Sequence, residues 1–191
     1  MPTDYPAEIG KLYHSLARRK QLGLVIFFVT SVCNAKCRTC FYWEELNQRG
    51  DLTWDEIKRL SETMPRFPDF WLSGGEPMLR RELTEIIQLF YVNNGVRWVN
   101  LPTNGLLPER TADWVERICR ENPELHLDLN VAMDGLHEMQ DSIRAVPGNF
   151  KKTPAVGKAD KKLAAATKAA LAARKAFVAA GGGDDAEQLQ L

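Results

Sequence analysis

The sequence lacks the features that would direct a protein to a membrane, a secretory route or a nucleic acid. Its 25 basic and 25 acidic side chains give a formal net charge of zero, so nothing attracts it electrostatically to nucleic acid or to an anionic membrane. The most apolar run, residues 24–29, is far shorter than the ~20 residues of a membrane-spanning helix. The N-terminus, with Asp4 and Glu8, shows no apolar signal segment. We therefore expect a cytoplasmic protein with no nucleic-acid or membrane partner.

Cysteine is also scarce, but it is unevenly distributed. Three of the four cysteines, Cys33, Cys37 and Cys40, fall within eight residues, and Cys119 stands alone. In a reducing compartment such a cluster indicates a metal site rather than disulfides. A structural zinc site usually takes two separated Cys-x-x-Cys pairs, and the sequence has no second pair. Three thiolates suit a 4Fe-4S cluster better, because they hold three irons and leave the fourth for a non-protein ligand. A zinc site or unliganded thiols remain the alternatives.

The composition changes sharply near residue 154. Residues 1–154 contain six alanines, whereas residues 155–191 contain thirteen. This Ala/Lys-rich segment favours a helix, but its large apolar side chains are too sparse for a core-facing stripe. We predict an ordered domain over residues 1–153 and an appended tail over residues 154–191, helical at first and then disordered.

Hydrophobic periodicity divides the domain into alternating strands and helices. Strands are expected where short runs are apolar or alternate with polar residues, at 24–30, 70–73, 96–101 and 125–133. Helices are expected at 5–21 within the N-terminal segment 1–22, between the Thr53–Glu56 capping box and Pro65, at 82–94 and at 109–122. The first strand is continuously apolar, which predicts burial of both its faces.

This alternation predicts an α/β fold with a parallel sheet and right-handed crossovers. In such folds, the loops at the carboxyl ends of the strands build the site. Here those loops carry the cysteine cluster, Gly74-Gly75-Glu76-Pro77, Pro102-Thr103-Asn104-Gly105 and Met133-Asp134-Gly135. The unusual sequence is therefore expected to gather along one edge of the sheet.

Taken in this order, these motifs resemble those of the radical S-adenosylmethionine (radical SAM) enzymes. The resemblance covers about residues 22–153 and rests on the three clustered cysteines, the segment 74–77, Thr103-Asn104-Gly105 and Met133-Asp134-Gly135. It implies a partial (β/α)6 barrel of the radical SAM type. It also implies that Cys33, Cys37 and Cys40 bind a 4Fe-4S cluster whose open iron chelates S-adenosylmethionine. An electron from the cluster then cleaves the sulfonium, and the resulting 5′-deoxyadenosyl radical abstracts a substrate hydrogen.

The resemblance further implies which residues contact the cofactor. The segment Gly74, Gly75, Glu76 and Pro77 is expected to meet the amino group of the methionine moiety. Its two glycines also allow the backbone to approach a ligand closely, although a plain strand-to-helix turn would use them equally well. Asn104 is expected to line the cofactor pocket, although Asn-Gly is also a generic turn pair.

Two positions depart from the family pattern. Many relatives have a serine where this chain has Ala132, which puts a ribose contact in doubt and leaves Asp134 to serve. The residue before the last cluster cysteine is usually aromatic and lies near the adenine, whereas here it is Thr39. Phe41, Tyr42 and Trp43 follow directly after Cys40, and one of them, with Phe41 as the candidate, is expected to stack on the base, although packing of the loop explains them equally well.

The fourth predicted strand suggests a further hypothesis. Its polar residues His126, Asp128 and Asn130 share one face. In a barrel that face looks into the lumen, so these residues are candidates for a polar substrate chamber or for a simply hydrated face. Cys119 is expected to be a small core residue of the helix at 109–122.

The function expected from the resemblance is that of a radical SAM oxidoreductase or transferase. It requires a flavodoxin- or ferredoxin-like electron donor and a substrate that the sequence does not identify. No catalytic residue is assignable beyond the cluster. The alternatives are an iron–sulfur electron carrier, which the missing fourth cysteine argues against, and an inactive iron–sulfur-binding fragment.

The sequence predicts fewer strands than the implied barrel contains. Residues 155–191 show no strand-like apolar run, so the barrel is expected to be truncated after about four strands. A frameshifted or prematurely ended reading frame would give such a change, as would a genuine alternative C-terminus or a fused tail. The fourth strand would then present an open edge.

Overall fold

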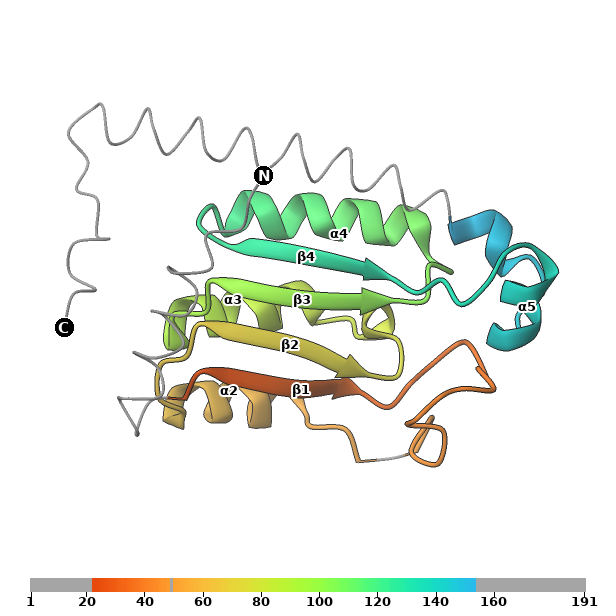
Figure 1. The fold of residues 1–191 in the computed structure, drawn as a ribbon. Coiled ribbons are helices and arrows are strands. Elements are labelled where there is room, and N and C mark those ends of the chain that lie inside the picture. The colour runs from red at the N-terminus through yellow and green to blue at the C-terminus, as the bar shows by residue number, and fades with distance from the viewer. Residues whose placement is uncertain (1–21, 49, 154–191) are drawn as a thin grey trace, which may run out of the picture.

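The computed structural model describes residues 22–48 and 50–153. The predicted helix at 5–21 and the predicted tail at 154–191 lie outside the described residues. Within them, strands and helices alternate along the chain (Figure 1): β1 (Leu24–Thr30), α2 (Trp54–Thr63), β2 (Asp69–Gly74), the short 3-10 helix η1 (Pro77–Leu79), α3 (Leu83–Asn94), β3 (Trp98–Thr103), α4 (Pro108–Glu121), β4 (His126–Val131) and α5 (Glu138–Arg144).

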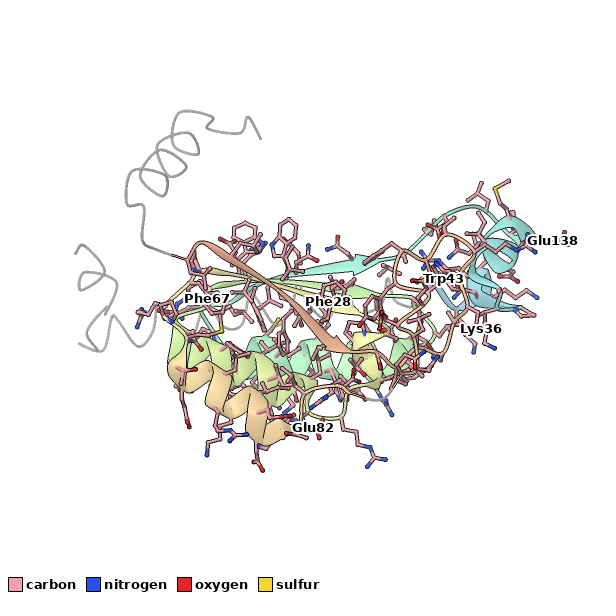
Figure 2. All side chains as sticks on the ribbon, turned by 90° about the horizontal axis from the view of Figure 1, so that it is seen from below. Phe28, Lys36, Trp43, Phe67, Glu82 and Glu138 are labelled. Carbon is pink, nitrogen blue, oxygen red and sulfur yellow. The ribbon has the colours of Figure 1, made fainter. Side chains whose placement is uncertain are left out.

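The four strands form one open parallel sheet in the order β1-β2-β3-β4. Helices α2, α3 and α4 cover one face of this sheet, and α5 lies beyond the carboxyl ends of the strands (Figures 1 and 2). Each strand therefore ends at the same edge. The predicted α/β class and its partial, barrel-like arrangement of four strands are confirmed.

Local sequence signals explain where the helices begin and end. Thr53 and Glu56 form the expected capping box at α2: the Thr53 hydroxyl accepts from the Glu56 amide, and the Glu56 carboxylate accepts from the Thr53 amide. Gly95 ends α3 in the left-handed conformation, with φ of 69°. No helix in the described part of the chain is long and apolar enough to cross a bilayer.

The core lies between the sheet and its helices. Its centre is a group of four buried phenylalanines, Phe27, Phe67, Phe70 and Phe90, in which the Phe70 and Phe90 ring centroids lie 4.7 Å apart. Aromatic pairs at this separation add to the free energy gained from burial alone. Cys119 is buried in the same core, as its position on a helix suggested.

The opposite face of the sheet has no layer of helices among the described residues, although the Phe41 and Tyr42 rings contact Phe28 at one end of it. On β1, Ile26 is 56% exposed and Phe28 is 44% exposed. The prediction that β1 is buried on both faces is therefore wrong. A continuous apolar run indicates a strand that two layers can cover, but whether both layers exist is decided by the rest of the fold.

Truncation of a core phenylalanine should destabilise the sheet and helices together. Phe70 is fully buried, whereas its neighbour Trp71 points to the open face and is 44% exposed. We expect Phe70→Ala to lower the free energy of unfolding by about 3–5 kcal/mol, because a large cavity replaces the ring. Urea titration followed by circular dichroism measures this change. Trp71→Ala is the control, and an equal loss from both substitutions would contradict the assignment of the core.

Candidate functional site

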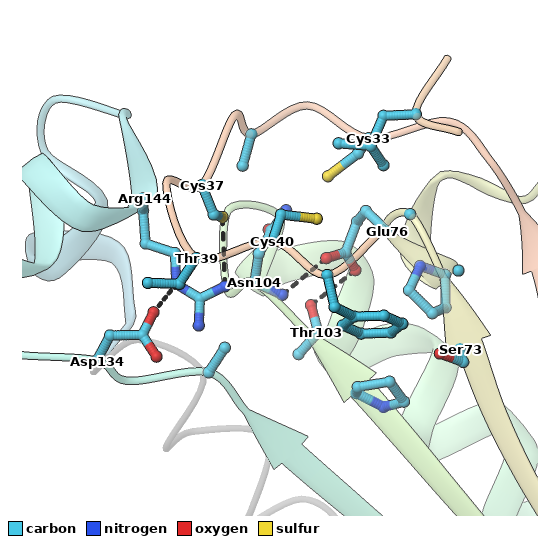
Figure 3. A pocket seen from close by; sticks show the side chains of 18 residues that line it. Cys33, Cys37, Thr39, Cys40, Ser73, Glu76, Thr103, Asn104, Asp134 and Arg144 are labelled. Carbon is cyan, nitrogen blue, oxygen red and sulfur yellow. Dashed lines mark hydrogen bonds and ion pairs between the residues drawn. The ribbon is translucent and has the colours of Figure 1, made fainter. Parts of the chain in front are cut away.

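A cavity of about 320 Å³ opens at the carboxyl ends of the strands. Side chains from all four strand-end loops line it, as the sequence predicted (Figure 3). Cys33, Cys37 and Cys40 all lie on its wall. Among the described residues that line it, Arg144 is the one cation and Glu76 and Asp134 are the carboxylates. The cavity therefore gathers soft sulfur ligands and both signs of charge in one place.

The loop that carries the cysteines is held by hydrogen bonds at its root and at its middle. Asp51 accepts from the Thr30 hydroxyl and the Ser31 amide, each at 2.8 Å, at the root of the loop. Further along, the Arg38 amide donates to the Ile143 carbonyl of α5 at 2.9 Å. These bonds hold the loop over the cavity without requiring a ligand.

The three cysteine side chains are half-buried and form no disulfide. Burial raises the pKa of the Cys33 thiol, so a metal that binds there has to displace a proton. No group of three potential ligands among the described His, Cys, Asp and Glu residues is close enough to hold a single metal ion.

Gly74 and Gly75 allow two backbone segments to approach each other. The Gly75 amide donates to the Thr30 carbonyl at 2.7 Å, and the Glu76 amide donates to the Val32 carbonyl at 2.8 Å. A Cβ atom at Gly74 would collide with the Thr30 carbonyl, and one at Gly75 with the Val32 carbonyl. The close approach that these glycines permit is therefore to the root of the cysteine loop.

Glu76 is a buried carboxylate that joins the ends of β2 and β3. It is 2% exposed. One of its oxygens accepts from the Thr103 hydroxyl at 2.9 Å and the Met78 amide at 3.1 Å, and the other accepts from the Asn104 amide at 2.7 Å. Burial raises the pKa of Glu76, against the opposing effect of these hydrogen bonds. The geometry thus compensates in part for removing the carboxylate from water.

Asn104 connects three loops around the cavity. Its side-chain amide donates to Asn34 of the cysteine loop at 2.8 Å, and its side-chain oxygen accepts from the Leu106 amide at 3.0 Å. Its backbone carbonyl accepts from the buried side chain of Asn149 at 3.1 Å. The Asn-Gly pair is therefore more than a generic turn in this fold.

A chain of buried amides continues from Asn149 to the end of β4. Gln140 donates to Asn149 at 2.7 Å and to the Ala132 carbonyl at 3.1 Å, and it accepts from the Asp134 amide at 2.7 Å. Both amide side chains are fully buried. Because each amide both donates and accepts, the network fixes the β4 loop relative to the β3 loop.

Arg144 reaches the cavity from the last turn of α5. It forms an ion pair with Asp134 at 2.5 Å and lies 3.5 Å from the Cys37 sulfur (Figure 3). Its side chain is 15% exposed. The guanidinium of Arg144 thus lies between the Cys37 sulfur on one side and the Asp134 carboxylate on the other.

The comparisons with known proteins agree with this arrangement. The family model of the radical SAM superfamily matches residues 27–159, a span that begins within β1 and contains β2, β3, β4 and every cavity residue named above. The chain belongs to the radical SAM superfamily. A solved structure described as histidine-tagged anSMEcpe with bound AdoMet is 26% identical to it, with a TM-score of 0.55. The match covers 74% of this chain but 41% of that one.

The radical SAM motifs found in the sequence meet at one site, but the sequence did not reveal all of its residues. Arg144, Gln140 and Asn149 were missed because α5 has no strong apolar periodicity, and because buried amides give no signal in a sequence. Phe41 does line the cavity. It is 79% exposed, and its ring contacts the rings of Phe28 and Tyr42.

The polar residues of β4 are divided between the two ends of the strand. His126 and Asp128 lie toward its start, where Asp128 accepts from the Trp98 indole at 2.6 Å and lies 3.0 Å from His126. At about 3.3 Å per residue, the first residue of a six-residue strand lies roughly 16 Å from its last. His126 is therefore remote from the cysteine cavity, and Asn130 is the member of this group nearest to it along the strand.

The hydrogen bonds of Glu76 lead to a testable prediction. In Glu76→Gln, one acceptor oxygen becomes a donor, so at least one buried amide or hydroxyl loses its partner. We expect the free energy of unfolding to fall by about 1–3 kcal/mol, as measured by urea titration. The exposed Glu62→Gln serves as the matched control. An unchanged stability in Glu76→Gln would show that this carboxylate does not join the strand ends.

Proposed function

We propose that the chain is a radical SAM enzyme that binds a 4Fe-4S cluster and S-adenosylmethionine in the cavity at the strand ends. The observation that carries this proposal is that three cysteine thiols share one wall of a cavity with a buried carboxylate and a guanidinium. An amino acid cofactor with opposite charges requires both of these groups. The match covers 41% of the solved structure's chain, so we propose this activity for a chain that corresponds to part of that protein.

The cysteine loop supports the cluster part of the proposal. Cys33, Cys37 and Cys40 would hold three irons, because thiolates are the soft ligands that iron–sulfur clusters take. The remaining iron would have no ligand from this loop. When bound, the cluster and S-adenosylmethionine together supply one-electron chemistry that yields methionine and a 5′-deoxyadenosyl radical.

The polar groups of the cavity support the cofactor part. Glu76 accepts three hydrogen bonds, and a carboxylate has about four acceptor positions, so one remains for the ammonium of the methionine moiety. Arg144 is suited to the methionine carboxylate, since a guanidinium binds carboxylates with two parallel hydrogen bonds. Its present partner, Asp134, would then be available to the ribose.

Asn104 and Phe41 complete the proposed cofactor site. Asn104 uses both ends of its side chain within the protein, so we propose that it shapes the cavity rather than binding the cofactor by its amide. Phe41 would stack on the adenine from the exposed rim. The substrate stays unidentified, and the electron would come from a separate donor protein.

The residues that line this cavity fit the function of an iron–sulfur electron carrier less well. Electron transfer alone gives no role to a guanidinium such as Arg144 in the cavity, and it favours a cluster whose irons all have protein ligands. The superfamily membership of the chain points the same way.

Cluster binding should depend on three of the four cysteines. After reconstitution with iron and sulfide without oxygen, we expect close to four irons and four sulfides per chain, from the 4Fe-4S stoichiometry. Cys33→Ala, Cys37→Ala and Cys40→Ala should each lose most of the bound iron and the visible absorption of the cluster. Cys119→Ala, which alters a core cysteine, should retain both. Full iron content in the three loop variants would contradict the proposed ligands.

Cleavage of S-adenosylmethionine tests the activity itself. With dithionite as reductant, the reconstituted chain should release 5′-deoxyadenosine, which chromatography detects. Arg144→Ala should raise the KM for S-adenosylmethionine about tenfold or more, because a charge-assisted bond to the carboxylate is lost, while its iron content stays unchanged. Exposed Arg59→Ala is the control. A loaded cluster without any 5′-deoxyadenosine would favour the iron–sulfur-binding fragment.

A further inference from the structure

We propose that the outer side of the cysteine loop is the docking surface for an acidic one-electron carrier protein. This surface, the outer hollow, is lined by Lys36, Cys37, Arg38, Trp43, Leu46 and Asn47 and encloses about 580 Å³. The inference rests on the proposed function, because it names the partner that the same site requires.

The position of Cys37 is the first support. Cys37 lines both the outer hollow and the inner cavity with Glu76 and Arg144. Among the described residues, the cysteine loop therefore stands between the proposed cluster and solvent on this side. A donor seated in the outer hollow would contact a cluster ligand directly, whereas Cys33 and Cys40 line the inner cavity alone.

The charge of the outer hollow is the second support. Lys36 and Arg38 are its charged lining residues, and both are exposed. Glu44 and Glu45 lie on the same loop but do not line the hollow. Two exposed cations beside a redox centre favour an acidic partner, because complementary potentials accelerate encounter and fix orientation.

An exposed aromatic ring completes the surface. Trp43 is 66% exposed, and Figure 2 shows it with Lys36 at the end of the molecule that carries α5. Tryptophan is enriched among residues that dominate binding energy at protein interfaces, as is arginine. A cationic hollow with one apolar anchor suits a small, transient interface rather than a permanent one.

The proposed reaction also requires such a partner. Reductive cleavage of one S-adenosylmethionine consumes one electron: the carrier loses it, and S-adenosylmethionine gains it as a carbon–sulfur bond breaks. The described residues supply no reductant of their own for this step. The donor is therefore an acidic carrier of single electrons, for which a flavodoxin is a suitable probe.

The test compares two charge reversals of equal size. Binding of oxidised flavodoxin to the full chain is measured by calorimetry at low salt, for the wild type, for Lys36→Glu/Arg38→Glu and for Lys58→Glu/Arg59→Glu. Lys58 and Arg59 are exposed on α2, away from the cysteine loop. We expect the first double variant to bind at least about tenfold more weakly, Trp43→Ala to weaken binding as well, and the α2 variant to stay within about twofold of the wild type. Circular dichroism checks that each variant is folded.

The release of 5′-deoxyadenosine provides a second readout. With dithionite, the Lys36→Glu/Arg38→Glu variant should match the wild type, whereas with reduced flavodoxin it should be slower by about tenfold or more. Absence of binding, or equal weakening by both double variants, would overturn the docking surface. No nucleoside from the wild type with dithionite would instead refute the proposed function, whatever the binding data show.

Discussion

The buried carboxylate of Glu76 is the interaction on which the arrangement of the site depends. Its backbone amide is bonded to the root of the cysteine loop, and its side chain is bonded to the end of β3. One residue thus connects three of the four strand-end loops. A carboxylate is suited to this position because it accepts several hydrogen bonds at once, and backbone amides at strand ends need acceptors. The hydrogen bonds from these donors offset part of the cost of burying the carboxylate.

The sequence was sufficient to predict the strands and most of the helices, because their signals are local. The capping box at Thr53, Gly95 at the end of α3 and the apolar run of β1 act within a few residues, and the structure has each of them where expected. Parallel pairing then placed the motifs at one edge without further information. The exposure of Ile26 and Phe28 could not be predicted in this way, since it depends on whether a second layer covers the sheet.

The residues of the site were also predictable only where the sequence signal is local. The cysteines, the two glycines and Glu76 stand in compact motifs and were found. Arg144 and the buried amides Gln140 and Asn149 were not found, because their place in the site depends on contacts with residues on other elements of the fold. For Gly74 and Gly75, the sequence indicated that the backbone can be approached closely by a ligand. In the structure, the atoms that approach these glycines are backbone carbonyls of the chain itself.

The proposed chemistry sets two opposing requirements, and the cysteine loop lies between the two spaces that we propose meet them. Chemistry with reactive radicals needs a cavity that excludes water, whereas delivery of an electron needs close access from outside. We propose that the inner cavity serves the first requirement; its Glu76 side chain is held in place by buried hydrogen bonds. The outer hollow meets the second with exposed cations and a tryptophan. Cys37 borders both spaces, so under this proposal an electron would arrive beside the cavity without having to cross it. The loop between these two spaces is fixed at its root by Asp51, which binds Thr30 and Ser31, and at its middle by the bond from the Arg38 amide to the Ile143 carbonyl.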